Sequence, residues 1–221
     1  IVMYFGAILY LSASTVITAR EFQNRSRLLI YPLILFVMAE TIIQVALPEL
    51  HVTWLCVTLL SVLYFIYCSE MWNQLDALTG LLNQNSYLKQ TGGVRYKGGV
   101  LVVFDVDDFK QINDRYGHIQ GDLCLAGIAE CIKKSYANFG YCYRIGGDEF
   151  CVLLKNGGNE GRCKQEFLQR LQEKRGEIAF LPTVSYGSAP FSGEDIVKVK
   201  DRADQDMYQY KKERKNRKRL S

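Results

Sequence analysis

The chain has 221 residues, of which 48% are hydrophobic, and a formal net charge of +4 at pH 7. Its seven cysteines form no CxxC pair and no cluster with histidine, which argues against a zinc site and favours reduced, buried thiols in a cytosolic domain. No segment has the pattern of a cleavable signal peptide. The first third of the chain is nearly all apolar, whereas the rest has the composition of a soluble domain.

Three apolar stretches in the first third are long enough to cross a bilayer, which takes about 20 residues each. They are residues 1–19, 28–47 and 50–68. The loop after the first stretch carries three arginines, and the turn after the second carries no Lys or Arg. The positive-inside rule therefore places the arginine loop and the C-terminal domain in the cytoplasm. The predicted organisation is a transmembrane region, a linker and a soluble domain: residues 1–68, 69–75 and 76–221.

The predicted membrane region has two further features. It begins at Ile1 within an apolar run, so we expect that its own N-terminal part is missing. Glu40 is the one ionisable residue deep in a predicted span, with Gln44 one helical turn later. Such a carboxylate either senses a signal or, when protonated, joins neighbouring helices, and the second role is the more common one. A buried helical hairpin in a soluble protein is the alternative to the spans, and their near lack of charge disfavours it.

From Asp76 onward, short apolar runs alternate with amphipathic segments. The continuous run at residues 100–104 is typical of a strand buried on both faces. Two more runs flank Gly146 and Gly147 as in a hairpin. Strands that alternate with helices predict an α/β or α+β sandwich with a central mixed sheet flanked by helices. The predicted strands are residues 100–104, 141–145, 149–154 and 183–188, and the predicted helices are residues 109–115, 122–136, 161–175 and 196–212.

Acidic residues stand at the ends of two predicted strands. Asp105 ends one strand, and Asp148 and Glu149 open another, directly after two glycines that allow a tight turn or the close approach of a ligand. If these strands are neighbours, the carboxylates meet at one edge of the sheet, where ligands of α/β sheets gather. Hard cations such as Mg²⁺ prefer these oxygen ligands and usually keep phosphate oxygens as partners.

Polar groups after Asp105 are suited to a nucleotide. The backbone amides of residues 106–110 open a short helix and form an anion cradle, to which Lys110 adds a positive charge. Asn113 and Asp122 follow in the sequence and supply an amide and a carboxylate that can read a guanine base. A carboxylate can accept from N1–H and N2–H₂ of guanine while an amide donates to an acceptor, and adenine lacks that pair of donors.

The soluble domain resembles the GGDEF-domain diguanylate cyclases. The resemblance covers residue 76 to about residue 219, and four motifs carry it in the same order as in the family. They are Asp76-x-Leu78-Thr79-Gly80-Leu81, the run from Asp105 to Asp122, Gly146-Gly147-Asp148-Glu149-Phe150, and Ala203-Asp204-x-x-Met207-Tyr208-x-x-Lys211.

The resemblance implies a palm-like fold, as in nucleotidyl cyclases and polymerases, and a homodimer. Together with the predicted spans, it predicts a location in a bacterial cytoplasmic membrane. Two GTP molecules, one per protomer, would condense into cyclic di-GMP and two pyrophosphates. The catalytic residues that it implies are Asp105, Asp148 and Glu149, with Asp148 as the base for the 3′-hydroxyl. The implied ligands of Mg²⁺ or Mn²⁺ are Asp105, the Val106 carbonyl, Glu149 and Asp148. The implied substrate-binding residues are Asn113 and Asp122 for guanine, Lys110, Lys211 and Lys215 for phosphate, and Phe109 and Gly147 along the nucleotide.

The chain departs from the family pattern in three places. The Arg-x-x-Asp of the product-inhibition site is replaced by Ala137-Asn-Phe-Gly140, so we expect no such inhibition. Lys215 replaces the arginine of the closing motif and lacks its bidentate fork. Gln84 stands where the entry motif usually has arginine.

Two alternatives stay open at this point. A GGDEF module that binds GTP without catalysis, and signals by protein contact, is the alternative to an active cyclase. The basic tail from Lys211 to Arg219 could bind anionic lipid or nucleic acid, but a solvated helix end is more common, and we expect no nucleic acid partner. Asp107 and Asp108 are predicted to cap the following helix rather than to bind metal.

Overall fold

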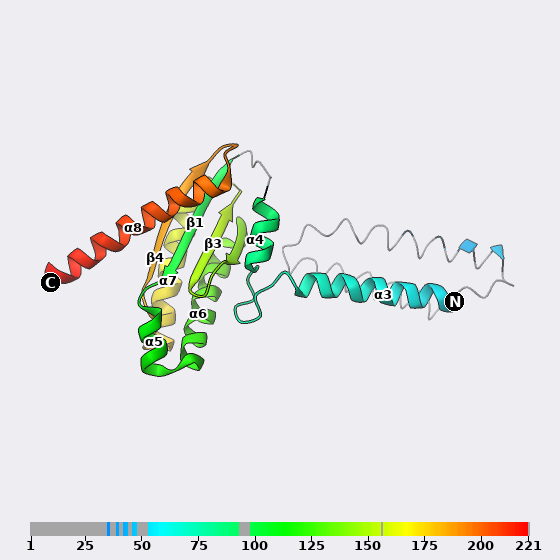
Figure 1. The fold of residues 1–221 in the computed structure, drawn as a ribbon, viewed down its shortest axis with the longest axis horizontal. Helices are drawn as coiled ribbons and strands as arrows, with labels where there is room; N and C mark the ends of the chain where they lie inside the picture. The colour runs from blue at the N-terminus through cyan, green and yellow to red at the C-terminus, as the bar shows by residue number, and fades with distance from the viewer. Residues whose placement is uncertain are drawn as a thin grey trace. The chain divides into compact units, whose positions relative to one another are not determined.

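The structure is a computed structural model that describes residues 35, 39, 42–43, 46–47, 53–92, 98–155 and 157–220. The chain divides into two compact units, residues 1–73 and residues 74–221. Each unit is described by itself below, and the helices and strands carry the labels of Figure 1.

In the first unit, helix α3 (Thr53–Trp72) occupies most of the third predicted span and continues into the predicted linker. The first predicted span and most of the second, including Glu40, lie outside the described residues. In the described part of the chain, no helix combines the length and the apolar character that a membrane crossing needs. Transmembrane helices are therefore not confirmed. Five large apolar side chains of α3 are nevertheless exposed: Leu59, Val62, Leu63, Phe65 and Ile66.

The second unit is built on one sheet of four strands in the order β2-β3-β1-β4 (Figure 1). All neighbouring pairs of this sheet are antiparallel, so the expected mixed sheet is wrong. The helices after β1 return the chain so that β2 runs parallel to β1, but the β2–β3 hairpin places β3 between them. The four strands are β1 (Gly99–Val106), β2 (Gly140–Arg144), β3 (Glu149–Leu154) and β4 (Val184–Phe191).

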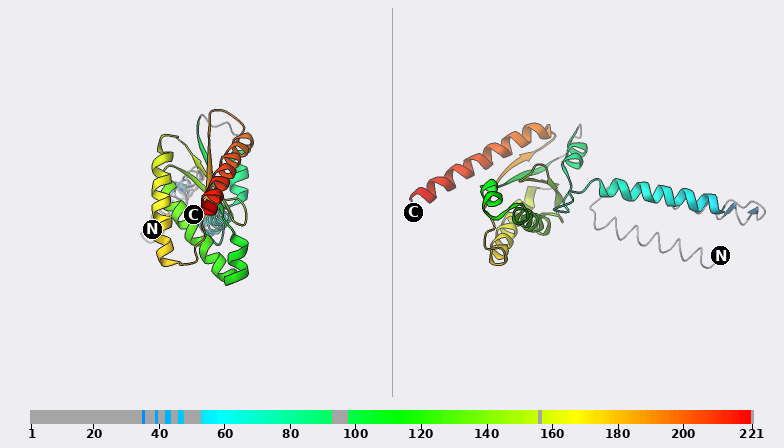
Figure 2. Two further views of the ribbon diagram at one scale, coloured as in Figure 1. Left: turned by 90° about the vertical axis from the view of Figure 1, so that its left-hand side faces the viewer. Right: turned by 60° about the horizontal axis from the view of Figure 1, so that its bottom comes forward.

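Helices cover both faces of the sheet, which confirms the predicted α+β sandwich. Figure 2 shows α8 on one side of the sheet and α6 and α7 on the other. The predicted helices after β1, β3 and β4 are all present, and α6 begins four residues before the predicted start because it follows α5 directly after Gly117. The helices are α4 (Gln84–Thr91), α5 (Phe109–Tyr116), α6 (His118–Tyr136), α7 (Glu160–Glu177) and α8 (Ile196–Leu220), with a short 3₁₀ turn, η2 (Gly157–Asn159), before α7.

The alternation of side chains along β1 creates two cores. Val102 and Phe104 belong to a core cluster with residues of α6 and α7, whereas Leu101 and Val103 belong to a cluster with residues of α4 and α8. A strand with both faces covered can carry a continuous apolar run, as the sequence of β1 predicted. Burying this much apolar surface supplies the main driving force for folding.

Helix α8 crosses β4 at very short range because the strand has a glycine there. A Cβ atom at Gly187 would lie 2.2 Å from the Ala203 oxygen and 2.2 Å from the Met207 nitrogen. The close crossing brings the second half of α8 to the end of β1, where Lys211 contacts Asp105.

The cysteines of the second unit are free thiols, as the sequence predicted. Cys124, Cys131, Cys142, Cys151 and Cys163 are all buried and form no disulfide. Burial raises the pKa of the Cys142 thiol to about 12, so this side chain behaves as a small apolar group rather than as a nucleophile.

Candidate active site

The predicted carboxylates converge at one end of the sheet. Asp105 at the end of β1 is the register partner of Glu149 at the start of β3. The Val106 amide donates a hydrogen bond of 3.2 Å to the Asp148 carbonyl, so the turn before β3 is tied to the end of β1. The two strands are neighbours, as the expected meeting of their carboxylates required. Asp105 and Asp148 are half-buried and Glu149 is exposed, so the group is open to a ligand.

The turn between β2 and β3 does not need its glycines for their backbone conformation. The amides of Ile145 and Gly146 both donate to the Glu149 carbonyl, at 3.0 and 3.3 Å. Neither Gly146 nor Gly147 has a φ angle in the left-handed region. A Cβ atom at Gly147 would meet nothing within 4 Å. The space beside Gly147 is therefore open, which fits the second predicted reason for a glycine, the close approach of a ligand.

An arginine that the sequence analysis did not single out holds this turn. Arg144 donates from Nε and Nη2 to the Gly147 carbonyl oxygen, at 3.2 and 2.7 Å, and from Nη1 to Asp76 Oδ1 at 3.0 Å. Asp76 also accepts from the Thr79 amide and hydroxyl, at 2.9 and 2.6 Å. Burial alone would raise the pKa of Asp76, but the bonds from Thr79 and Arg144 outweigh it and hold that pKa below its ordinary value. The Asp76 carboxylate is therefore a stable anchor for Arg144.

Two cations of α8 reach the end of β1. Lys211 Nζ lies 2.5 Å from Asp105 Oδ1 and 3.9 Å from Asp107 Oδ1. Arg214 Nη1 lies 3.0 Å from Asp107 Oδ2. Lys211 is thus at the predicted site, where it contacts a carboxylate. The side chain of Lys215 lies outside the described residues. Arg214, which directly precedes Lys215, was not predicted to belong to the site, and its guanidinium lies there.

The predicted capping roles of Asp107 and Asp108 are wrong. Asp107 accepts hydrogen bonds from the hydroxyls of Thr183 and Ser185, at 2.8 and 2.6 Å, in addition to its ion pair with Arg214. Its carboxylate is therefore committed to β4 and α8 and is not directed at the start of α5. Asp108 does occupy the position before α5, with a left-handed φ of 54°, but its side chain makes no capping hydrogen bond.

The residues predicted to contact the base lie on α5 and α6. The Asn113 Oδ1 atom is buried and has no hydrogen-bond partner. A Cβ atom at Gly121 would lie 1.9 Å from this oxygen and 3.2 Å from Phe109 Cζ, so the glycine leaves the space that both side chains use. Asp122, the next residue, is exposed, as is Lys110 on α5. A buried, unpaired acceptor is costly, and a ligand with an N–H donor would satisfy it.

Oxygen donors at this site suit a divalent cation in kind, although a complete ligand set is not assembled. Asp105 and Glu149 face each other across β1 and β3, and carboxylates are the donors that Mg²⁺ prefers. Among the residues that the structure describes, no three acidic, histidine or cysteine side chains form a group that could hold a metal ion. The Lys211 ammonium already lies on Asp105. Metal binding at Asp105, Val106, Asp148 and Glu149 therefore stays a prediction.

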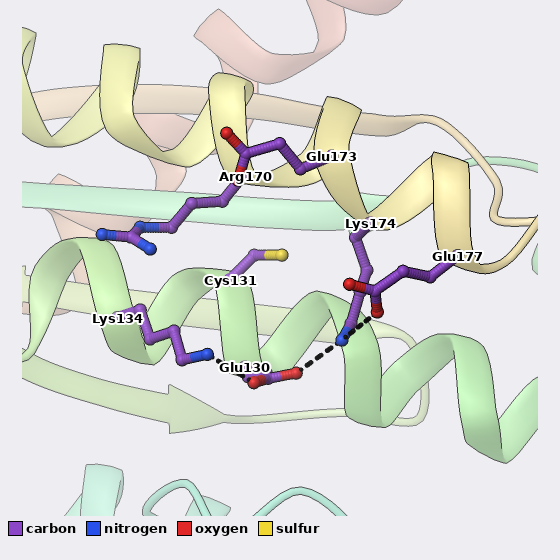
Figure 3. Close-up of a pocket in the computed structure, with 7 residues that line it drawn as sticks. All are labelled: Glu130, Cys131, Lys134, Arg170, Glu173, Lys174 and Glu177. Atoms are coloured by element: carbon purple, nitrogen blue, oxygen red, sulfur yellow. Dashed lines mark hydrogen bonds and ion pairs between the residues drawn. The ribbon is translucent and has the colours of Figure 1, made fainter.

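A separate pocket lies between α6 and α7, with a volume of about 70 Å³ (Figure 3). Glu130 forms ion pairs with Lys134 at 2.6 Å and with Lys174 at 2.8 Å, and Lys174 also pairs with Glu177 at 2.9 Å. Hydrogen bonds from the two lysines lower the pKa of Glu130 to about 2. The pair between Glu130 and Lys174 links α6 to α7, so we interpret the pocket as a structural contact between the two helices, which we call the Glu130 seam. Its lining residues are Glu130, Cys131, Lys134, Arg170, Glu173, Lys174 and Glu177.

Comparison with known proteins identifies the class to which this fold and site belong. Residues 73–217 match the family described as "Diguanylate cyclase, GGDEF domain", so the chain belongs to the GGDEF family. The match covers all four strands of the second unit and includes every residue of the candidate active site.

Particular relatives are similar over the same region. The diguanylate cyclase DgcS of Shewanella oneidensis is 32% identical over 154 residues, which are 66% of this chain and 52% of that protein. DgcP of Pseudomonas aeruginosa is 35% identical over 159 residues, 64% of this chain and 23% of that protein. The GGDEF domain of DgcB from Caulobacter crescentus, solved in complex with c-di-GMP, has 27% identity and a TM-score of 0.52, with 63% of this chain and 88% of that chain covered. The chain thus spans about a quarter to a half of these two curated relatives.

Proposed function

We propose that this chain is a diguanylate cyclase that condenses two molecules of GTP into cyclic di-GMP and two pyrophosphates. The observation that carries the proposal is the placement of Asp105 opposite Glu149, with Asp148 tied beside them through the Val106 amide. Degenerate members of a catalytic family commonly lose such carboxylates, whereas this chain has kept all of them at one end of the sheet.

The geometry supports a role for each part of the site. Asp122 accepts from N1–H and N2–H₂ of guanine, and the Asn113 amide, whose Oδ1 is buried without a partner, contacts the same edge of the base. Phe109 and the open space at Gly147 accommodate the nucleotide. Lys110 and Lys211, with Lys215, neutralise phosphate oxygens. Discrimination against ATP follows because adenine lacks the pair of donors, N1–H and N2–H₂, that the Asp122 carboxylate would accept from.

The reaction requires a base, a nucleophile and a leaving group. Asp148 takes the proton of the 3′-hydroxyl, the 3′-oxygen forms a bond to the α-phosphorus of the other GTP, and pyrophosphate leaves. A divalent cation, Mg²⁺ or Mn²⁺, bound by Asp105, the Val106 carbonyl and Glu149, with Asp148 as a further ligand, would supply charge neutralisation at the phosphates. Most of the acceleration would come from holding the hydroxyl and phosphorus in line.

The chemistry makes one copy of the site incomplete. Each GTP provides a nucleophile for the α-phosphate of the other, and one chain has one set of base-reading residues, so two protomers must face each other. We propose that residues 1–68 lie in the cytoplasmic membrane, with the GGDEF domain in the cytoplasm, and set the geometry of this homodimer. The exposed apolar side chains of α3 support an interaction of this region with lipid or with a second copy.

A direct assay tests the proposed function. The purified chain is incubated with GTP and Mg²⁺, and cyclic di-GMP is measured by chromatography. We expect product from the wild-type chain, none from Asp148→Ala, and unchanged activity in Asp201→Ala, which removes an exposed carboxylate of α8. GTP binding by Asp148→Ala should stay close to that of the wild type. A dimeric wild-type sample that binds GTP without forming product would favour the alternative, a silent GTP-binding module.

A further inference from the structure

Two basic side chains of α8 form ion pairs with two carboxylates at the end of β1. The two ion pairs differ in how firmly the basic side chain is held. Lys211 lies on Asp105 at 2.5 Å, and Arg214 lies on Asp107 at 3.0 Å. The first pair involves a carboxylate of the proposed catalytic group. The second involves a carboxylate that the proposed reaction does not use.

Arg214 is held from several directions. Besides its pair with Asp107, it donates to the Thr183 hydroxyl and, at 3.4 Å, to the Val184 carbonyl. Asp107 itself is fixed by the hydroxyls of Thr183 and Ser185. A planar guanidinium with this many partners loses several charge-assisted hydrogen bonds if it moves, so Arg214 is a fixed part of the structure.

Lys211 is held much less firmly. It has one short contact, with Asp105, and a second carboxylate oxygen only at 3.9 Å. The side chains of Lys211 and Asp105 are 29% and 21% exposed, so water screens the pair. An ammonium on a flexible four-carbon chain can leave such a partner at small cost when a stronger anion comes within reach.

Lys211 lies on one oxygen of the Asp105 carboxylate, and its positive charge repels a divalent cation that approaches the same group. We propose that Lys211 is a positioning residue that occupies Asp105 until a nucleotide arrives, and that it then moves to the phosphates and frees Asp105 for the metal. Metal and nucleotide therefore bind cooperatively, and the metal alone binds weakly. This inference rests on the proposed function, because it uses Asp105 as a metal ligand and a nucleoside triphosphate as the anion.

Binding of Mn²⁺ to the purified chain without nucleotide tests the exchange, that is, the replacement of Lys211 by the metal at Asp105. The free Mn²⁺ is measured by electron paramagnetic resonance for the wild type, Lys211→Gln and the matched control Lys212→Gln, which removes an exposed charge from the next position of α8. We expect Lys211→Gln to bind Mn²⁺ about fivefold more tightly than the wild type, a factor near the upper end for a partly exposed ion pair. Lys212→Gln should match the wild type.

The same titration with 3′-deoxy-GTP, which cannot react, measures the cooperativity. The nucleotide should tighten Mn²⁺ binding more in the wild type than in Lys211→Gln, because only the wild type has a lysine to displace. Equal or weaker Mn²⁺ binding by Lys211→Gln without nucleotide would overturn the exchange. So would Mn²⁺ binding that survives unchanged in Asp105→Asn, since the metal would then lie elsewhere.

The outcome for the exchange is separable from that for the proposed function. If Lys211→Gln binds Mn²⁺ more tightly but the wild-type chain forms no cyclic di-GMP, the exchange is supported and the cyclase is rejected. Product formation by a wild-type chain whose Mn²⁺ affinity does not depend on Lys211 would support the cyclase and reject the exchange.

Discussion

The guanidinium of Arg144 donates two hydrogen bonds to the carbonyl oxygen of Gly147, at 3.2 and 2.7 Å. Its third contact is with Asp76, at 3.0 Å, near the beginning of the second unit. Because Gly147 directly precedes Asp148, one side chain connects the entry of the domain with the proposed base.

We expect Arg144→Lys to impair catalysis more than binding. An ammonium cannot make two parallel bonds to the carbonyl and also reach Asp76, so the turn should lose its fixed position. A small displacement of the base should lower kcat by about tenfold with little change in KM for GTP. Steady-state kinetics of cyclic di-GMP formation measures both constants.

The control for that variant is Arg162→Lys, an exposed substitution on α7. Its arginine pairs with Glu166 across one helical turn and lies 5.9 Å from the centre of the Phe139 ring. It should leave kcat unchanged. A similar kcat for Arg144→Lys and the wild type would show that the turn holds its position without the guanidinium.

Gly121→Ala should disturb recognition of the base. The new methyl group would lie 1.9 Å from Asn113 Oδ1 and 3.2 Å from Phe109 Cζ, so both side chains must shift. Overpacking of this kind costs about 1–3 kcal/mol. We expect a higher KM for GTP and a smaller preference for GTP over ATP, measured by competition binding, together with a lower melting temperature.

Gly161→Ala is the matched control, because it also adds a methyl group to a helical glycine. A Cβ atom at Gly161 meets nothing within 4 Å. This variant should gain about 0.5–1 kcal/mol of stability and keep its preference for GTP. Equal nucleotide preferences in the two variants would remove Asn113 from base recognition.

The Glu130 seam predicts a pH dependence of stability. Its hydrogen bonds with Lys134 and Lys174 lower the pKa of Glu130 from an ordinary 4.5 to about 2. A group with a lowered pKa stabilises the fold above pH 4.5 and loses this contribution as the pH falls through about 2. Since the Glu130 side chain is 43% exposed, solvent screening limits the contribution to about 0.5–1 kcal/mol.

Glu130→Gln should therefore lower the free energy of unfolding at pH 7 by this amount and have a vanishing effect near pH 2. Urea unfolding at both pH values measures the difference. Glu173→Gln, which removes another carboxylate from the same pocket, is the matched control and should lower the free energy of unfolding at pH 7 less than Glu130→Gln does. A pH-independent loss in Glu130→Gln would indicate that the seam acts through packing rather than charge.

Added cyclic di-GMP should not inhibit the proposed cyclase reaction. Residues 137–140 lack the arginine and the carboxylate that an inhibitory site of the Arg-x-x-Asp kind needs. Initial rates with and without added product test this.

Restoring the site by A137R/G140D should fail, because a Cβ atom at Gly140 would lie 2.4 Å from the Leu153 oxygen and force the edge of the sheet apart. A stable double variant with product inhibition would contradict this reasoning.

Most strands and helices of the second unit could be predicted because they have clear local signals. The apolar run of β1, for example, follows from its two covered faces. The direction of the strands could not be predicted, because it depends on where the β2–β3 hairpin inserts. The sequence likewise did not reveal the roles of Arg144 and Asp107, because each depends on partners far away in the chain, such as Asp76, 68 residues from Arg144, and Thr183, 76 residues from Asp107.

The pairing of Asp105 with Glu149 has a consequence for the length of the signature turn. In a sheet, moving one strand by a single residue turns all of its side chains to the opposite face. An insertion or deletion of one residue between β2 and β3 could therefore move Glu149 away from Asp105 without changing either residue. Gly146 to Phe150 thus acts as a spacer as well as a set of chemical groups, and its length should tolerate less variation than several of its side chains.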